Sequence, residues 1–326
     1  SQGWPGQDVV GEDNDPMDFE SHGTNCAGIV AAITDNGIGI AGTSPGSKIM
    51  AVRCGWLTNE GQGVVRMDFA SSGMVYAAAN GANIINCSWG SSSFLNSAVS
   101  AAQSAGCLVV TAAGNDDNDT APYLGTRSGV MAVAASDAND AKASFSNFGT
   151  WVEITAPGVA MYTTAYVFDT DTSTYGSVQG TSFSSPAVCG AAALIWSAHP
   201  TWNWQTVHSA LVTSADNIDA ENPGFTGLLG AGRVNLQRAL GDNVQQYPAE
   251  YPTIFDAINC SSAGDTVKVQ SGNMLNEVVT LDDGEVNVFG GYECGYVTRD
   301  PLGGPTVIAG TLCFAVLGFA GGVGGD

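Results

Sequence analysis

The stretch Gly180-Thr181-Ser182-Phe183-Ser184-Ser185-Pro186 precedes an apolar segment, residues 187–197, whose composition predicts a helix. A serine at a helix start is usually an N-cap residue. The same position also suits a nucleophile, because unpaired backbone N–H groups and the positive end of the helix dipole can stabilise a developing oxyanion. The rest of the chain must decide between these two interpretations of Ser182.

Upstream of this stretch, short apolar runs alternate with segments of helical spacing. Strands are predicted at residues 49–54, 83–87, 107–113 and 131–135, and helices at residues 68–80 and 94–105. Runs that are apolar throughout are typical of strands covered on both faces, and strand–helix–strand repeats indicate a parallel sheet. The fold class is therefore α/β, with a mostly parallel sheet and helices on both faces. Such sheets place their chemistry at the carboxyl ends of the strands.

Two further motifs fit a serine nucleophile. The stretch Ser21-His22-Gly23-Thr24-Asn25-Cys26-Ala27-Gly28 opens a predicted helix, and Ala112-Ala113-Gly114-Asn115 ends a predicted strand. A histidine can take the proton of a serine hydroxyl, and a side-chain amide can bind an oxyanion. Alone, each motif has a structural explanation, such as turn chemistry for Asn115. The three together, in this order, favour acyl transfer.

The three motifs resemble the His, Asn and Ser boxes of the subtilisin-like serine proteases, matched by residues 22–28, 113–115 and 180–186. The resemblance covers residues 1–243 and includes a closing segment at residues 230–235. It implies His22 as general base and Ser182 as nucleophile. It also implies an oxyanion hole formed by Asn115 and the backbone N–H of Ser182. The function that it implies is a secreted serine endopeptidase that works through an acyl-enzyme.

The resemblance also implies substrate-binding edges, where a peptide pairs in extended form. One edge follows the strand at residues 83–87, and the other lies near residue 62. With the backbone beside Asn115, the expected substrate-binding residues are Ser88, Trp89, Gly90, Gly61, Gly63, Ala113 and Gly114. For Trp89, a place in the core or at the rim and a place in a subsite wall remain open.

The third member of the family's triad, an aspartate in an apolar strand well before the histidine, finds no match. The four candidates Asp8, Asp13, Asp15 and Asp18 lie in acidic sequence rich in Gly and Pro, which predicts a solvated loop. We therefore expect the acid to belong to a segment upstream of residue 1, and the chain as given to be nearly inactive. A nucleophilic role is considered for Cys26, but this residue is expected to face the helix interior.

A structural calcium loop is the one cofactor site that the sequence suggests, and no catalytic cofactor is expected. Residues 34–40 resemble the family's calcium loop after the His helix, with Thr34, Asn36, Ile38 and Ile40 as oxygen ligands. A glycine-rich turn without metal is the alternative. The net charge of −22 argues against nucleic acid and anionic membranes as partners and suits a salty or calcium-containing fluid.

The eight cysteines show no metal-site spacing, and most of the first five are predicted to be small buried hydrophobes. Disulfide pairing stays open. His199 and His208 are interpreted as surface or structural residues. No apolar run is long enough to span a bilayer. We expect an extracellular or cell-surface monomer that acts on polypeptides.

The sequence changes in character after residue 243. Residues 244–326 carry short β-rich pieces and resemble the opening of a right-handed parallel β-helix, with a capping helix at residues 251–258. Contact of this module with a surface or a polysaccharide is left open. The alternative to a protease is a non-enzymatic surface adhesion or binding protein with a degenerate subtilase domain.

Overall fold

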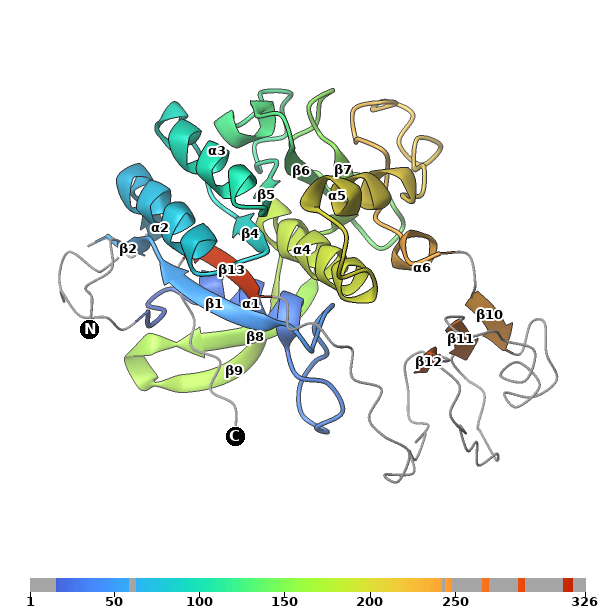
Figure 1. Cartoon of the computed structure of the whole chain (residues 1–326), viewed down its shortest axis with the longest axis horizontal. Coiled ribbons are helices and arrows are strands. Elements are labelled where there is room, and N and C mark those ends of the chain that lie inside the picture. The colour runs from blue at the N-terminus through green and yellow to red at the C-terminus, as the bar shows by residue number, and fades with distance from the viewer. Residues whose placement is uncertain are drawn as a thin grey trace. The chain divides into compact units, whose positions relative to one another are not determined.

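The computed structural model describes residues 16–58 and 63–241, together with the backbone of four short strands further along the chain. The chain forms two units. The first unit holds the elements from α1 to α6 together with β13 (Cys313–Gly318), and the second holds β10 to β12 (Figure 1). The predicted capping helix at residues 251–258 lies outside the described residues.

A six-stranded parallel sheet is the centre of the first unit. Its strands lie in the order β1 (Lys48–Arg53), β13, β4 (Ile84–Cys87), β5 (Leu108–Ala112), β6 (Val130–Ser136) and β7 (Ile154–Pro157). Strands β4, β5 and β6 consist of buried residues throughout, as the continuous apolar runs predict. The parallel α/β sheet expected from the sequence is confirmed.

Strand β13 lies between β1 and β4 and pairs with both in parallel. The sequence analysis assigned residues 313–318 to the C-terminal module, whereas the structure places them in the sheet of the first unit. The apolar sequence Cys-Phe-Ala-Val-Leu-Gly suits a strand with neighbours on both sides.

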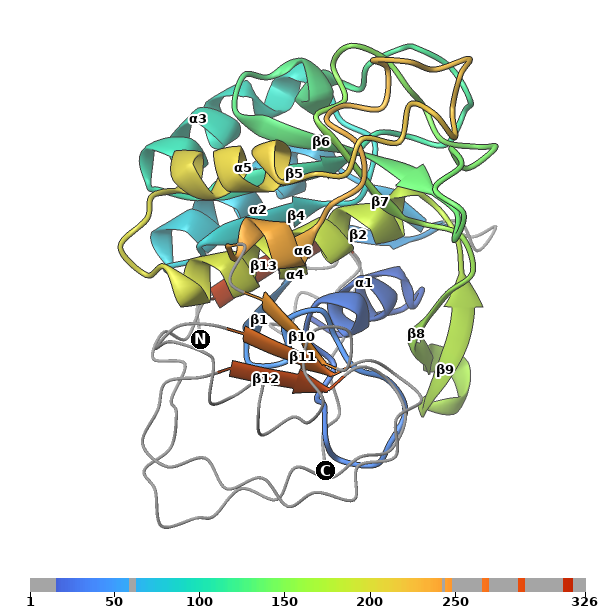
Figure 2. The ribbon, with the colours of Figure 1, turned by 90° about the vertical axis from the view of Figure 1, so that its right-hand side faces the viewer.

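Helices cover both faces of this sheet (Figures 1 and 2). On one face, α2 (Met67–Ala79) and α3 (Asn96–Ser104) pack on a core cluster that includes Ile85 and Cys87 of β4. Successive residues of a strand point to opposite faces, so Asn86 points the other way. It contacts α4 (Thr181–Ala198), which packs against α1 (His22–Ala31). The His and Ser boxes therefore share one face.

Helix α4 begins at Thr181, six residues before the predicted start, so the whole Ser motif after Gly180 is helical.

Smaller elements complete the unit. An antiparallel hairpin of β8 (Met161–Val167) and β9 (Thr172–Val178) packs on α1 (Figure 2). The remaining elements are β2 (Gly55–Leu57), β3 (Gly63–Val65), α5 (Trp204–Thr213), α6 (Leu236–Ala239) and the 3-10 turns Ser93–Leu95, Tyr123–Thr126 and Phe168–Thr170.

The second unit contains three parallel strands, β10 (Val244–Tyr247), β11 (Thr266–Val269) and β12 (Asn287–Gly290). They are neighbours in sequence order, and they begin at residues 244, 266 and 287. The β-helix interpretation of this region stays a prediction.

Candidate active site

Ser182 is the second residue of α4, where backbone N–H groups have no partner within the helix. Gly180 precedes the helix with a φ of 146°, a conformation that glycine adopts readily. Pro186 lies inside the helix, four residues after Ser182. Because proline has no N–H, the carbonyl oxygen of Ser182 lacks its usual helical partner. This carbonyl oxygen is therefore available to groups from outside the helix.

Side chains from two other elements bind this carbonyl oxygen. Ser88 Oγ donates to it at 2.8 Å, and Cys26 Sγ donates at 3.4 Å. In return, Ser182 Oγ donates to the backbone carbonyl of Ser88 at 3.3 Å. Ser88 directly follows β4, and Cys26 lies in α1. The contacts fix the serine motif at the carboxyl end of the sheet, where the sequence placed it.

His22 lies close to the serine motif, because Cys26 contacts both His22 and Ser182. The Sγ atom of Cys26 is 4.0 Å from His22 Nδ1, and the imidazole ring packs 5.5 Å from the ring of Phe183. Burial lowers the pKa of His22 to about 4, so the ring is neutral at neutral pH. Burial also raises the pKa of the Cys26 thiol to about 12, which argues against a nucleophilic role for Cys26.

Asp18 corrects the expectation of a solvated loop before the histidine. The residue is fully buried, and its carboxylate accepts bonds from the backbone N–H groups of Glu20, Ser21 and Thr24 and from the Thr24 hydroxyl. These donors lie at the first turn of α1, where a carboxylate satisfies unpaired N–H groups. Asp18 thus anchors the helix that carries His22. Asp8, Asp13 and Asp15 lie outside the described residues.

Strand β8 holds the opposite side of α1. Thr163 and Thr164 donate their hydroxyls to the carbonyl oxygens of Asn25 and Thr24, both at 2.8 Å. A Cβ atom at Gly28 would collide with the Thr164 hydroxyl. The glycine that closes the His motif therefore permits the close approach of helix and hairpin.

Asn115 follows β5, and its amide orientation is fixed by α4. Its Oδ1 accepts bonds from the backbone N–H and the hydroxyl of Thr181, both at 2.9 Å. A backbone N–H can only donate, so the contacting atom must be oxygen. The Nδ2 group is thereby left on the side of Gly180, beside the nucleophile. The structure brings Asn115, Ser182 and His22 together, as the sequence predicted.

The expected substrate-binding residues have different surroundings. Ser88 is buried, and its hydroxyl donates to the carbonyl oxygen of Ser182, while Gly90 is exposed. Trp89 is partly buried and packs on the core cluster under α2 and α3, which favours the core or rim interpretation. Gly63 begins β3, and Gly61 lies outside the described residues. Ala113 and Gly114 directly precede Asn115, where an extended peptide would pass.

Asn86 is a site residue that the sequence analysis missed. It is fully buried in β4, donates to Ser88 Oγ at 2.9 Å and accepts from Ser185 Oγ at 2.6 Å. It thereby links the strand, the substrate edge and the Ser motif. An asparagine in the apolar run Asn83-Ile-Ile-Asn-Cys87 was the available clue, because a buried polar side chain needs partners.

The loop predicted to bind calcium is exposed and strongly turned. Asp35, Gly37 and Gly39 have φ values of 61°, 71° and 66°. The Asn36 side-chain oxygen accepts the Ile38 N–H at 3.0 Å, and this oxygen retains a second lone pair. Among the described residues, no group of three or more His, Cys, Asp or Glu side chains is placed to hold a metal ion. A cation here would depend on amide and carbonyl oxygens, which suits calcium.

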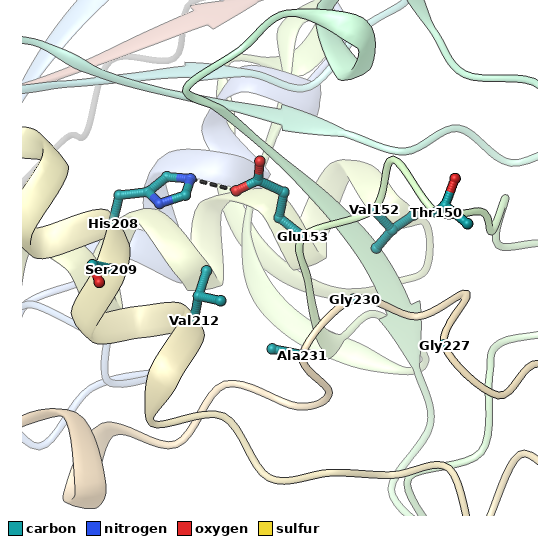
Figure 3. A pocket seen from close by; sticks show the side chains of 9 residues that line it. All are labelled: Thr150, Val152, Glu153, His208, Ser209, Val212, Gly227, Gly230 and Ala231. Atoms are coloured by element: carbon teal, nitrogen blue, oxygen red, sulfur yellow. Dashed lines mark ion pairs between the residues drawn. The ribbon is translucent and has the colours of Figure 1, made fainter.

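A hollow in the first unit lies away from these residues. It has a volume of about 470 Å³ and contains His208 of α5, which pairs with Glu153 (Figure 3). Glu153 directly precedes β7 and so lies at the amino end of the sheet, the edge opposite to Ser88 and Asn115. His199 stacks on Trp202 at 3.9 Å. The interpretation of both histidines as surface or structural residues stays a prediction.

Cys26, Cys54, Cys87, Cys107 and Cys189 are buried free thiols, as predicted for small hydrophobes. The side chains of Cys260, Cys294 and Cys313 lie outside the described residues. Within the part of the chain that the structure describes, no helix has the length and apolar character needed to cross a membrane.

A helix-borne serine, a neutral histidine and a fixed asparagine amide at the carboxyl end of a parallel sheet define a serine hydrolase site. Residues 4–232 match the model of the Subtilase family, Peptidase_S8. The chain belongs to this family of serine peptidases.

Relatives of known name agree with this assignment. The chain is 41% identical over 239 residues to thermitase of Thermoactinomyces vulgaris, covering 72% of this chain and 80% of thermitase. It is 40% identical over 238 residues to a thermophilic serine proteinase of Bacillus sp. strain AK1, covering 72% of this chain and 56% of that relative. Among solved structures, a protease of Pseudoalteromonas arctica matches with a TM-score of 0.59 and 33% identity, over 67% of this chain and 69% of that one.

Proposed function

We propose that this protein is a secreted endopeptidase that cleaves polypeptides through an acyl-enzyme, with Ser182 as nucleophile and His22 as base. The observation that supports it best is the convergence on Ser182 of contacts from Cys26 of α1 and from Ser88, which directly follows β4. The retained His22, Asn115 and Ser182 disfavour a degenerate binding domain.

The chemistry follows from the positions of these groups. Ser182 Oγ attacks the substrate carbonyl carbon while His22 accepts the hydroxyl proton. The oxyanion receives bonds from Asn115 Nδ2 and from the backbone N–H of Ser182 at the start of α4. Collapse of this intermediate breaks the C–N bond, and the amine leaves with the proton from His22. Water then attacks the acyl-enzyme, again with His22 as base, and frees the acid.

A fluorophosphonate probe tests the proposal, because it labels only an activated serine. We expect the full-length protein, with the segment that supplies the triad acid, to gain one adduct at Ser182 and to lose it in Ser182→Ala and His22→Ala. Ser184→Ala, in the same helical turn, and His208→Ala, at the partly buried Glu153 pair, are the matched controls and should keep the adduct. No adduct on this folded full-length protein, or an adduct that survives Ser182→Ala, would refute the proposal.

We propose further that the loop at Thr34, Asn36, Ile38 and Ile40 binds a structural calcium ion. The turned backbone and the free lone pair of Asn36 support this site, and other oxygen ligands must complete it because calcium takes about 6–8. EDTA should lower the melting temperature of the wild-type chain and not that of Asn36→Ala. An equal response of both proteins would refute the site.

Three other expectations belong with this function. We propose that the protein works outside the cell as a monomer, which its acidic composition and its family support. We also propose that residues 244–309 begin a parallel β-helix that contacts surfaces or polysaccharide. Light scattering and a polysaccharide pull-down with the full chain test these expectations.

A further inference from the structure

Asn147 has a buried side chain that binds the loop of Asn115. It belongs to none of the three sequence motifs. It is 4% exposed and lies in the connection between β6 and β7. Its Nδ2 donates to the carbonyl of Ala113 at 3.1 Å. Its Oδ1 accepts the N–H groups of Asp116 at 2.9 Å and Asn118 at 3.3 Å. One amide thus binds the chain on both sides of Asn115.

The orientation of this amide is determined by its partners. Two backbone N–H groups face one atom, which must therefore be oxygen, and a carbonyl faces the other, which must be nitrogen. The backbone N–H of Asn147 also donates to the carbonyl of Gly114 at 2.9 Å. Gly114 has a φ of 105°, and a Cβ atom there would collide with Asn147 Nδ2. The glycine and the asparagine are complementary.

Two residues support Asn115 in different ways. Thr181 holds the amide oxygen of Asn115, as described above, and its hydroxyl also accepts the backbone N–H of Gly114 at 3.0 Å. Asn147 binds the backbone on both sides of Asn115, in a loop whose residues from Asn115 to Asp117 are exposed. A loop exposed to solvent has many conformations of similar energy, and only some of them aim Nδ2 at a substrate oxygen.

We propose that Asn147 is a positioning residue for the oxyanion hole, which acts through Asn115 and fixes its Nδ2 before substrate binds. The inference rests on the proposed peptidase function. Asn147 touches no substrate atom. Its contribution is preorganisation, which matters because an oxyanion donor that must reorganise during the reaction stabilises the transition state less.

Asn222 provides a matched control. It is also 4% exposed and makes three comparable bonds, accepting the N–H of Lys142 and donating to the carbonyls of Asp140 and Ile218. None of these bonds is made to residues 113–118, although Lys142 gives an indirect link because its Nζ pairs with Asp117. The carbonyls of Ala143 and Ser146 also bind this Nζ, and Asn222→Ala leaves them in place. Asn147→Ala and Asn222→Ala should thus cost similar stability, while only Asn147→Ala removes bonds made directly to the oxyanion loop.

The test measures peptide anilide hydrolysis by the full-length protein, with the segment that supplies the triad acid, and by its variants. We expect Asn147→Ala to lower kcat about 10- to 100-fold with KM nearly unchanged, since loss of an oxyanion donor outright costs about 10²–10³. Asn222→Ala should keep kcat within about twofold. Asn147→Asp, which keeps the oxygen acceptor, should recover part of the loss. In an Asn115→Ala background, Asn147→Ala should have little further effect, because both act through one amide.

A structural role alone would give different results. Equal kcat for Asn147→Ala and Asn222→Ala, or losses that multiply in the Asn115→Ala background, would overturn the proposal. Hydrogen exchange separates this proposal from the proposed function. Asn147→Ala should speed exchange at the amides of residues 114–118, and Asn222→Ala should not. If the full-length wild-type protein with its triad acid were inactive, the peptidase proposal would fail, and the exchange data would still decide the role of Asn147.

Discussion

Pro186 lies four residues after Ser182 in α4, and the carbonyl that it leaves without a helical partner accepts the Ser88 hydroxyl at 2.8 Å. A proline inside a helix normally costs stability. Here the Ser182 carbonyl, which lacks a helical partner, binds Ser88, the residue that directly follows β4. The backbone of Ser182 therefore joins α4 to the end of β4.

Restoring the missing N–H should loosen this junction. In Pro186→Ala, the new N–H can donate to the Ser182 carbonyl and compete with Ser88 and Cys26. We expect fluorophosphonate labelling several-fold slower than in wild type, with a folded helix by circular dichroism. Ser184→Ala loses only a bond to the carbonyl of Pro157 and should label at the normal rate. Wild-type labelling of Pro186→Ala would show that the junction is unimportant.

Asp18 should matter for stability although it is not a catalytic residue. Asp18→Ala leaves the first turn of α1 without its acceptor, and caps of this kind contribute about 0.5–2 kcal/mol. We expect a urea midpoint clearly below wild type and a slower Ser182 adduct, because α1 carries His22. Thr24→Val removes only the 2.7 Å hydroxyl bond and should cause the smaller loss. Equal midpoints for Asp18→Ala and wild type would contradict the anchoring role.

The pH dependence should reflect the buried imidazole. Burial lowers the pKa of His22 to about 4, against about 6.5 for an exposed histidine. The labelling rate should therefore hold down to about pH 5 and fall near pH 4. The unfolded chain protonates first, so stability is fully present above about pH 6.5 and is lost as the pH falls toward 4.

Histidine variants check this dependence. His22→Gln should lose the part of the acid-induced decrease in unfolding free energy that lies between about pH 6.5 and about pH 4. His199→Gln, which changes a ring stacked on Trp202, should retain it. A labelling profile with a midpoint near 6.5 would mean that the ring is not desolvated in solution.

The fold was largely predictable because the strands are buried on both faces, which leaves an apolar run for each of β4, β5 and β6. The three motifs also located Ser182, His22 and Asn115, since their chemistry needs particular residue types. Strand β13 could not be placed, because its partners lie more than two hundred residues away in sequence. Local composition carries no information on such pairings.

The supporting residues were less predictable for a related reason. Asp18 reads as part of an acidic loop, and Asn147 as an ordinary turn residue, because their roles depend on which backbone groups face them after folding. Asn86 gave a hint only through its polarity within a buried strand. A motif identifies the groups that react, whereas the groups that hold them depend on tertiary contacts.

The closing glycine of the His motif provides a last test. In Gly28→Ala, the new methyl group meets the Thr164 hydroxyl and must push α1 away from β8. Overpacking of this kind costs about 1–3 kcal/mol, and the displaced helix should also slow Ser182 labelling. The Thr163 hydroxyl also lies too close to the new methyl group, so Thr164→Ala removes only the nearer of two obstructing hydroxyls. The double variant should therefore recover part of the stability lost in Gly28→Ala, despite losing a hydrogen bond of its own. Thermal unfolding of the four proteins measures this coupling. Strictly additive losses would mean that the hairpin adapts and that Gly28 is needed for another reason.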